Sequence, residues 1–363
     1  MREFYIKEND AGQRLDRFIG KAVPLLPSSL CQKYIRKKRI KINGKSASQN
    51  RILIAGDVVA MYVNDEFFTP LKAPEQPADE VFQSSKKRAL TPLPSPPPDP
   101  AAFPPAASLA KKFNLNIVFE DENILLLNKP AGILCHSNSR TEDNSLLSEV
   151  LRYLQNCSEY DPRAENSFAP ALCNRIDRNT CGIVIAAKNA ETLRVINEKI
   201  RLREIDKYYL AVVRGRPNPP EGKIEGFWTK DKQKNKSTIL TNGTFPDGLV
   251  PTDAKKVITE YKTLTTRENI SLLECKLITG RSHQIRAFLS SIGHPIAGDK
   301  KYGGANFKGA NNADIEAFQA LCSYKLKFSF KTDAKILSYL DGKTFEIKDI
   351  PFINTYFGDN FRL

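Results

Sequence analysis

Residues 174–183 read Asn-Arg-Ile-Asp-Arg-Asn-Thr-Cys-Gly-Ile, and the apolar run Ile-Val-Ile-Ala-Ala follows at 183–187. An apolar run of this length indicates a buried strand. If the polar residues before it are extended, Arg175 and Asp177 project to the same face, because side chains alternate along a strand. The stretch therefore places a guanidinium and a carboxylate side by side, directly ahead of a buried strand.

The chain around this stretch mixes strand and helix patterns. Further buried or half-buried strands are predicted by the apolar runs at 124–127, 208–213 and 257–261. Residues 190–203 predict a helix, with Leu193, Ile196 and Ile200 facing inward. Near the end, Asp-Gly-Lys at 341–343 separates two short apolar segments and predicts a hairpin. The pattern favours an α+β domain built on a mixed, mostly antiparallel sheet.

Proline is concentrated in one region of the chain. Residues 70–105 hold eleven of the 23 prolines. Such a segment cannot pack a core and tends to an extended, semi-rigid conformation. We expect a linker at 70–112 between two domains, at 1–69 and 113–363.

The N-terminal domain has a compact, basic pattern. Residues 15–23 show helical spacing, and Ser28 and Ser29 can cap a second helix at 30–38. Lys-Ile-Asn-Gly-Lys at 41–45 predicts a turn between strands, and another strand is expected at 56–63. The order of these elements resembles the small α/β RNA-binding domain first seen in ribosomal protein S-four. Its expected RNA contacts are Lys33, Arg36, Lys37 and Arg39. A solvated helix face is the plainer interpretation of the same charges.

Composition limits the classes of function. The chain has 55 basic and 41 acidic residues, a net charge of +14, which favours polyanions such as nucleic acid. Seven scattered cysteines without C-x-x-C spacing argue against a disulfide framework or a zinc ribbon. Only three histidines are available for a metal site or a Ser–His–Asp triad. The sequence has no apolar run long enough for a membrane span. We expect a cytoplasmic monomer with no metal and no membrane partner.

Four blocks in the C-terminal domain resemble the signature motifs of the RluA-type pseudouridine synthases. They are Asn-Lys-Pro-Ala-Gly-Ile-Leu at 128–134, residues 174–183, Gly-Arg-Ser-His-Gln-Ile-Arg-Ala-Phe-Leu at 280–289, and Gly-His-Pro-Ile-Ala-Gly-Asp-Lys-Lys-Tyr-Gly at 293–303. The sequence departs from the family pattern at Asn174 and Phe288, where histidine is frequent, and at Cys181, where serine is. The resemblance spans residues 115 to about 330.

The resemblance implies conversion of uridine to pseudouridine, which breaks the bond from nitrogen to the anomeric carbon and rejoins the base through carbon. The reaction requires no cofactor or metal. It needs a carboxylate beside the sugar, acting as nucleophile or as base, and a group near the departing carbon proton. The resemblance assigns the carboxylate to Asp177, its paired guanidinium to Arg286, and the group beside the uracil to Tyr209. For Tyr208, directly before it in the chain, we expect only a core position.

The resemblance also implies how the RNA is held. Arg175 is expected to enter the RNA where the target base leaves, since an inserted planar cation can replace lost stacking. Arg178, Arg281 and His283 either contact phosphate or brace the loop. His294, in a Gly-His-Pro turn, is expected to be structural.

The domain combination looks like that of family members that modify large-subunit (23S) ribosomal RNA. A tRNA substrate stays open, as does the reading that the chain is a non-enzymatic RNA-binding or ribosome-assembly protein. An RNA hydrolase that uses Asp177 with other carboxylates ranks lower, because the sequence has no recognisable cluster of acidic metal ligands.

Overall fold

The computed structural model describes residues 1–68, 115–137, 144–231, 233–240, 251–304, 318–358 and 361. The predicted linker at 70–112 lies outside these residues. The described chain divides into two compact units: residues 1–68 together with Asp161–Phe168, and the rest. None of the helices in these ranges combines the length and apolar character needed to span a bilayer. The domain limits proposed from the sequence stay predictions.

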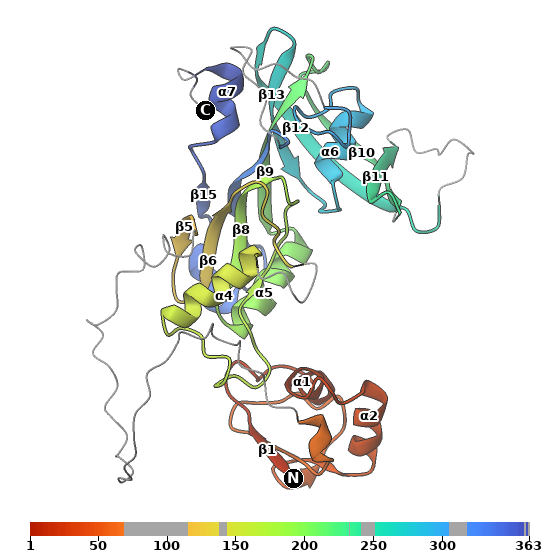
Figure 1. Ribbon diagram of the computed structural model, residues 1–363, viewed down its shortest axis with the longest axis vertical. Coiled ribbons are helices and arrows are strands. Elements are labelled where there is room, and N and C mark those ends of the chain that lie inside the picture. Colours follow the sequence, from red (N-terminus) through yellow and green to blue (C-terminus); the bar gives the residue numbers. More distant parts are fainter. Residues whose placement is uncertain are drawn as a thin grey trace, which may run out of the picture. The chain divides into compact units, whose positions relative to one another are not determined.

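The N-terminal unit packs two helices and a small antiparallel sheet around its own core (Figure 1). The sheet order is β1-β4-β2-β3. The elements are β1 (Arg2–Tyr5), α1 (Leu15–Ala22), α2 (Ser28–Arg36), β2 (Ile40–Ile42), β3 (Lys45–Ser46), β4 (Val58–Met61) and the 3-10 helix η1 (Asp65–Phe67).

Two local predictions for this unit have different outcomes. The Asn-Gly turn is confirmed: Asn43 (φ 51°) and Gly44 (φ 76°) both adopt the left-handed conformation that joins β2 to β3. The prediction that Ser28 and Ser29 cap the second helix is wrong, because Pro27 is the N-cap and no side chain caps α2. Helix α2 also ends at Arg36, earlier than predicted, since Lys38 turns to φ 58° and cannot continue it.

The segment Asp161–Phe168 belongs to the N-terminal unit although it is distant in sequence. The fully buried Asp10 carboxylate accepts hydrogen bonds from Ser167 Oγ at 2.6 Å and Asn166 Nδ2 at 2.7 Å. Gln13 Nε2 donates to Ser167 Oγ at 2.8 Å. These contacts are between polar side chains, so no hydrophobic pattern in the sequence indicates them.

The larger unit is built on an extensive sheet with helices against parts of it (Figure 1). Its strands are β5 (Ile117–Glu120), β6 (Ile124–Lys129), β7 (Ala171–Leu172), β8 (Cys181–Ala187), β9 (Ile205–Arg214), β10 (Glu221–Asp231), β11 (Lys236–Leu240), β12 (Lys255–Arg267), β13 (Ile270–Leu277), β14 (Leu321–Phe328) and β15 (Thr344–Glu346). Its helices are α4 (Leu146–Asn156), α5 (Ala190–Leu202), α6 (Gln284–Ser291), the 3-10 helix η3 (Lys335–Leu340) and α7 (Pro351–Phe357).

The sheet confirms the predicted fold class. Its order is β11-β10-β12-β13-β9-β14-β8-β6-β5, with β15 beside β14 and β7 beside β8. In the described residues only β14 and β8 pair in parallel, so the sheet is mixed and mostly antiparallel. Helix α5 packs on β8 and η3, and α6 packs on β11 and β12. In α5, Ile196 is fully buried, while Leu193 and Ile200 are half-buried.

The C-terminal hairpin prediction is wrong. The segment before Asp341 forms the 3-10 helix η3, and β15 after it pairs with β14 instead. The reason is burial: Leu337 and Leu340, three residues apart, are both fully buried, which 3-10 geometry allows on one face.

The parallel contact between β8 and β14 depends on Gly182. Its φ is 117°, and a Cβ on it would lie 2.3 Å from the Ser323 carbonyl oxygen. Glycine therefore lets the two backbones approach at the start of β8. Because residues 174–180 lead into this strand, the close contact positions the segment that carries Asp177.

Candidate active site

The segment between β7 and β8 holds the quoted motif in an irregular conformation. Asn174 Oδ1 accepts a hydrogen bond from Ile185 N at 2.8 Å, and Thr180 N donates to Asp177 O at 3.1 Å. Arg175 is exposed, Ile176 is buried, and the Asp177 side chain is 26% exposed. Asn174 therefore binds the backbone of β8, and the segment presents Asp177 at a partly open position.

The carboxylate of Asp177 meets the guanidinium of Arg286, which lies on α6. Arg286 Nη1 donates to Asp177 Oδ2 at 2.8 Å, the pairing expected from the sequence. The other edge of the guanidinium binds Asp299, with Nε to Oδ2 at 2.7 Å and Nη2 to Oδ1 at 2.9 Å. Such a two-point contact fixes the plane of the guanidinium. Arg286 thus links the almost fully buried carboxylate of Asp299 to the partly exposed carboxylate of Asp177.

Burial and charge act in opposite directions on Arg286. Burial alone would lower the pKa of its guanidinium, but the hydrogen-bonded Asp299 and the nearby Asp177 raise that pKa above its usual value. Arg286 therefore stays protonated near neutral pH. It is a permanent positive charge beside Asp177.

Asp299 and Tyr302 were not assigned a role from the sequence, although both lie in the fourth block. The Arg286 guanidinium lies 5.1 Å from the centroid of the Tyr302 ring. The Tyr302 hydroxyl accepts a hydrogen bond from Ser237 N at 2.8 Å and lies 3.0 Å from His283 Nδ1. The block therefore surrounds Arg286 with a carboxylate and an aromatic face.

His283 is the N-cap of α6 and adopts the left-handed conformation, φ 54°. Its Nε2 lies 4.0 Å from Asp177 Oδ2, beyond hydrogen-bond range. Burial lowers the pKa of the imidazole, and the positive charges of Arg286 and Lys301 add to this, although Asp177 opposes them. We conclude that His283 is neutral near pH 7.

The turn before α6 is held by Gln284, which is almost fully buried. Gln284 Oε1 accepts from Arg281 N at 3.1 Å, and Gln284 Nε2 donates to Thr259 Oγ1 at 3.0 Å. From the other side, Trp228 Nε1 donates to Ser282 O at 3.0 Å. These bonds attach the α6 N-terminus to β10 and β12, and so position Arg286.

Tyr209 lies in the middle of β9 and is almost fully buried. Burial raises the pKa of its hydroxyl well above the usual value; a hydrogen bond with Ser323 lowers it in part, and the charge of Asp177 raises it further. The phenol therefore stays protonated near neutral pH. Tyr208 is half-buried on the other face of the strand, with Lys325 Nζ 4.6 Å from its ring centroid.

Lys129, at the end of β6, was also missed by sequence reasoning. It is fully buried, and its ammonium donates to the carbonyls of Pro130 at 2.8 Å, Ile133 at 2.9 Å and Arg178 at 3.0 Å. Burial lowers its pKa to about 8. Lys129 thus ties the Pro/Gly turn of the first block to the segment that carries Asp177.

The remaining predicted RNA contacts lie on the surface. Arg178 Nε donates to Gly132 O at 2.9 Å, which braces the loop, and Arg281 is exposed. His294 Nδ1 lies 2.7 Å from Arg214 O, in keeping with a structural role.

In the N-terminal unit Lys33, Arg36, Lys37 and Arg39 are all exposed. Arg39 follows α2 and lies 5.8 Å from the Tyr34 ring centroid. In the described ranges no three His, Cys, Asp or Glu side chains gather to hold a metal.

Comparison with known proteins identifies the larger unit. Residues 123–291 match the family described as RNA pseudouridylate synthase. The ribosomal large subunit pseudouridine synthase C of Rickettsia bellii is 30% identical over 80% of this chain and 82% of its own length. An uncharacterized RNA pseudouridine synthase of Mycoplasma genitalium is 29% identical over 96% of this chain and 97% of its own length. The solved structure of human RNA pseudouridylate synthase domain containing 4 shares the fold, with a TM-score of 0.53 and 22% identity over 68% of this chain and 93% of that one.

Proposed function

Because the chain belongs to the RNA pseudouridylate synthase family, we propose that it isomerises specific uridines of large-subunit ribosomal RNA to pseudouridine. The chain is an isomerase that acts on RNA. The choice of ribosomal RNA is supported by the names of two relatives, the large subunit pseudouridine synthases C of Rickettsia bellii and Vibrio cholerae. The family match does not favour a non-enzymatic or a hydrolytic role.

The observation that carries the proposed mechanism is the ion pair between Asp177 and Arg286. Asp177 is the catalytic carboxylate, and acts on the sugar as nucleophile or as base while the bond from nitrogen to the anomeric carbon breaks. Arg286 orients it, because its own guanidinium plane is held by Asp299. The bond from the ring carbon to the anomeric carbon then forms, the proton on that ring carbon passes to water, and the freed nitrogen takes up one proton, so no proton is consumed overall.

Tyr209 is the group that we place beside the uracil. Its phenol stays protonated, so the neutral hydroxyl can donate a hydrogen bond to the base or accept one from it while the base turns. Its location at the middle of β9 gives it a rigid support, since β9 pairs with both β13 and β14. Arg175, exposed two residues before Asp177, is proposed to fill the space that the extruded uridine leaves.

The N-terminal unit is proposed to bind RNA. We also propose that the whole chain is a monomer and that it acts in the cytoplasm. Three of its cations, Lys33, Arg36 and Lys37, are exposed at the end of α2. No acidic side chain of the described residues forms an ion pair with any of them. They are therefore available for phosphate.

The substrate class can be tested by mapping pseudouridine in total RNA from cells with and without the gene. We expect specific sites in large-subunit rRNA to lose pseudouridine and to regain it when purified full-length protein is added to the unmodified RNA. Tritium release from uridine labelled at carbon five gives the rate. Loss confined to tRNA would overturn the rRNA assignment, and no tritium release from either RNA would contradict the reaction.

The RNA-binding role predicts a change in salt dependence. Substituting Lys33, Arg36 and Lys37 together by alanine should lower the slope of log affinity against log salt by about 2 to 3, since each lost phosphate contact removes about one released counterion. Exchanging lysine and arginine at the same three positions is the matched control and should preserve the slope. An unchanged slope in the alanine variant would show that this face does not contact RNA.

A further inference from the structure

We propose that a pocket at the start of β9 binds a phosphate group, at a site separate from the candidate active site. The pocket has a volume of about 260 Å³, several times the roughly 30 Å³ that a water molecule occupies in the liquid. It is lined by four cations, Arg203, Lys207, Lys276 and Lys331, and by one carboxylate, Asp206. None of its lining residues belongs to the set around Asp177 and Arg286.

The charges of the pocket do not balance. The one carboxylate is engaged, because Lys276 Nζ lies 3.0 Å from Asp206 Oδ2. Among the described residues, the side chains of Arg203, Lys207 and Lys331 form no hydrogen bond and no ion pair. Three of the cationic residues that line the pocket therefore have no paired anion among the described residues.

Lys207 is the residue for which an anion would matter most. It is half-buried in β9, whereas Arg203 and Lys331 are exposed. Burial lowers the pKa of its ammonium, and the charge of Asp206 offsets only part of this. Placing a lysine where it is desolvated and unpaired has a cost that a bound anion removes.

A buried hydrogen-bond network around Lys199 and Glu204 holds two of the segments that line the pocket. Lys199, almost fully buried, donates to Glu204 Oε2 at 2.8 Å and to Thr332 O at 2.6 Å. Ser329 N donates to Glu204 O at 2.9 Å. Glu204 follows Arg203 and Thr332 follows Lys331, so this buried network fixes the two backbones that carry the exposed cations.

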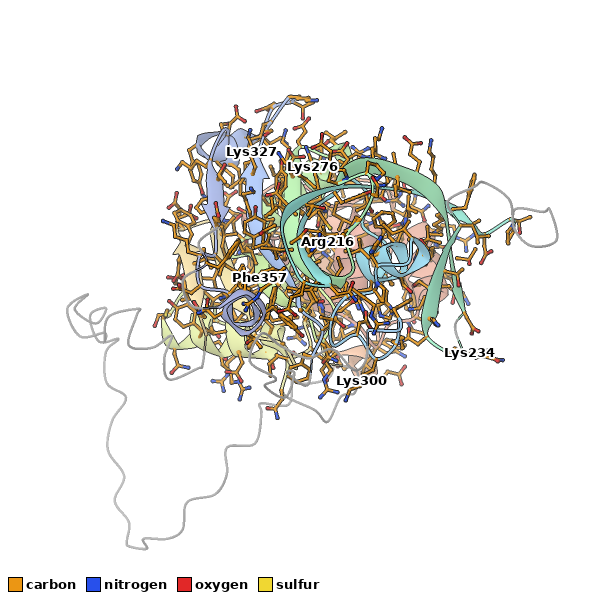
Figure 2. The ribbon with its side chains drawn as sticks, turned by 90° about the horizontal axis from the view of Figure 1, so that it is seen from above. Arg216, Lys234, Lys276, Lys300, Lys327 and Phe357 are labelled. Atoms are coloured by element: carbon orange, nitrogen blue, oxygen red, sulfur yellow. The ribbon has the colours of Figure 1, made fainter. Side chains whose placement is uncertain are left out.

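The chemistry of the lining favours phosphate over a carboxylate. A phosphate group carries about one to two negative charges and offers several acceptor oxygens, which suits three separate cations. Arginine and lysine together are the usual phosphate ligands, the former as a planar fork and the latter as a point charge. Figure 2 shows Lys276, and also Lys327, near the top of the view, on the strands that flank β9. The surroundings of the pocket are thus also cationic.

The occupant is either a backbone phosphate of RNA or a free phosphate-bearing molecule. A first experiment titrates full-length protein with inorganic phosphate at constant ionic strength, using chloride as the reference anion. We expect saturable binding and a rise of the melting temperature. Lys207→Met should weaken this binding by about tenfold or more, the effect of losing one charged hydrogen bond. Lys262→Met, which removes an exposed charge on β12 outside the pocket, is the matched control and should leave it unchanged.

A second experiment distinguishes the two sources. If an RNA phosphate occupies the pocket, Lys207→Met should also reduce the salt slope of RNA affinity by about one. If the slope is unchanged while phosphate binding is lost, the occupant is a free phosphate-bearing molecule. The proposal is overturned if phosphate binds no better than chloride, or if Lys207→Met binds phosphate as well as the parent protein. Should that variant not fold, Lys331→Gln, at an exposed position, must weaken phosphate binding for the proposal to stand. Because both readouts are binding, they are independent of pseudouridine formation.

Discussion

Asp177→Asn is expected to reduce pseudouridine formation by about 10⁴-fold, the upper end of what one proton-transfer group contributes. The amide cannot attack the sugar or accept a proton as a carboxylate does. Its oxygen can still accept the hydrogen bond from Arg286 Nη1, so the fold around the site should persist. Tritium release under single-turnover conditions measures the loss.

RNA binding separates a chemical defect from a misfolded protein. Asp177→Asn removes one negative charge from a basic protein, so RNA affinity should be equal or slightly higher. Asp253→Asn makes the same change at an exposed position and should keep full activity. An active Asp177→Asn enzyme would refute the mechanism, and loss of RNA binding together with activity would instead indicate misfolding.

The contiguous motifs made much of the site predictable. Asp177 and Arg286 each lie in a block whose residues are close in sequence, and the pairing between the blocks follows from the family resemblance. The strands at 124–127, 183–187 and 208–213 were predictable because buried strands leave continuous apolar runs. These patterns depend only on residues that are close in sequence, so they predict the strands without knowledge of the tertiary structure.

The missed residues depend on tertiary contacts. Asp299 lies in a polar turn, where an acidic residue normally predicts exposure, yet Arg286 compensates its charge in the core. Lys129 is buried at the end of a strand because two carbonyls of the turn that follows it and the carbonyl of the distant Arg178 accept hydrogen bonds from its ammonium. The segment Asp161–Phe168 has no hydrophobic pattern, and its attachment to Asp10 is a set of hydrogen bonds. Periodicity in the sequence does not predict hydrogen bonds or ion pairs between polar residues that are distant in the chain.

Arg286→Met is expected to lower the free energy of unfolding by about 3–5 kcal/mol, because it leaves Asp299 as a buried charge without its partner. The Asp299 side chain is 1% exposed. Without Arg286 its nearest remaining donors are the backbone N–H groups of Lys301 at 3.1 Å and Tyr302 at 3.3 Å. Urea denaturation measures the change. A loss of less than about 1 kcal/mol would mean that water reaches Asp299 in the variant.

A second substitution separates the structural role of Arg286 from its role beside Asp177. The double variant Arg286→Met with Asp299→Leu removes both buried charges, so it should recover most of the lost stability. Its activity should stay low, since Asp177 still lacks the guanidinium that orients it. If the double variant regained activity together with stability, Arg286 would act only through the fold. If stability returned and tritium release did not, the guanidinium would be shown to position the carboxylate, which is the role that the 2.8 Å contact to Asp177 Oδ2 supports.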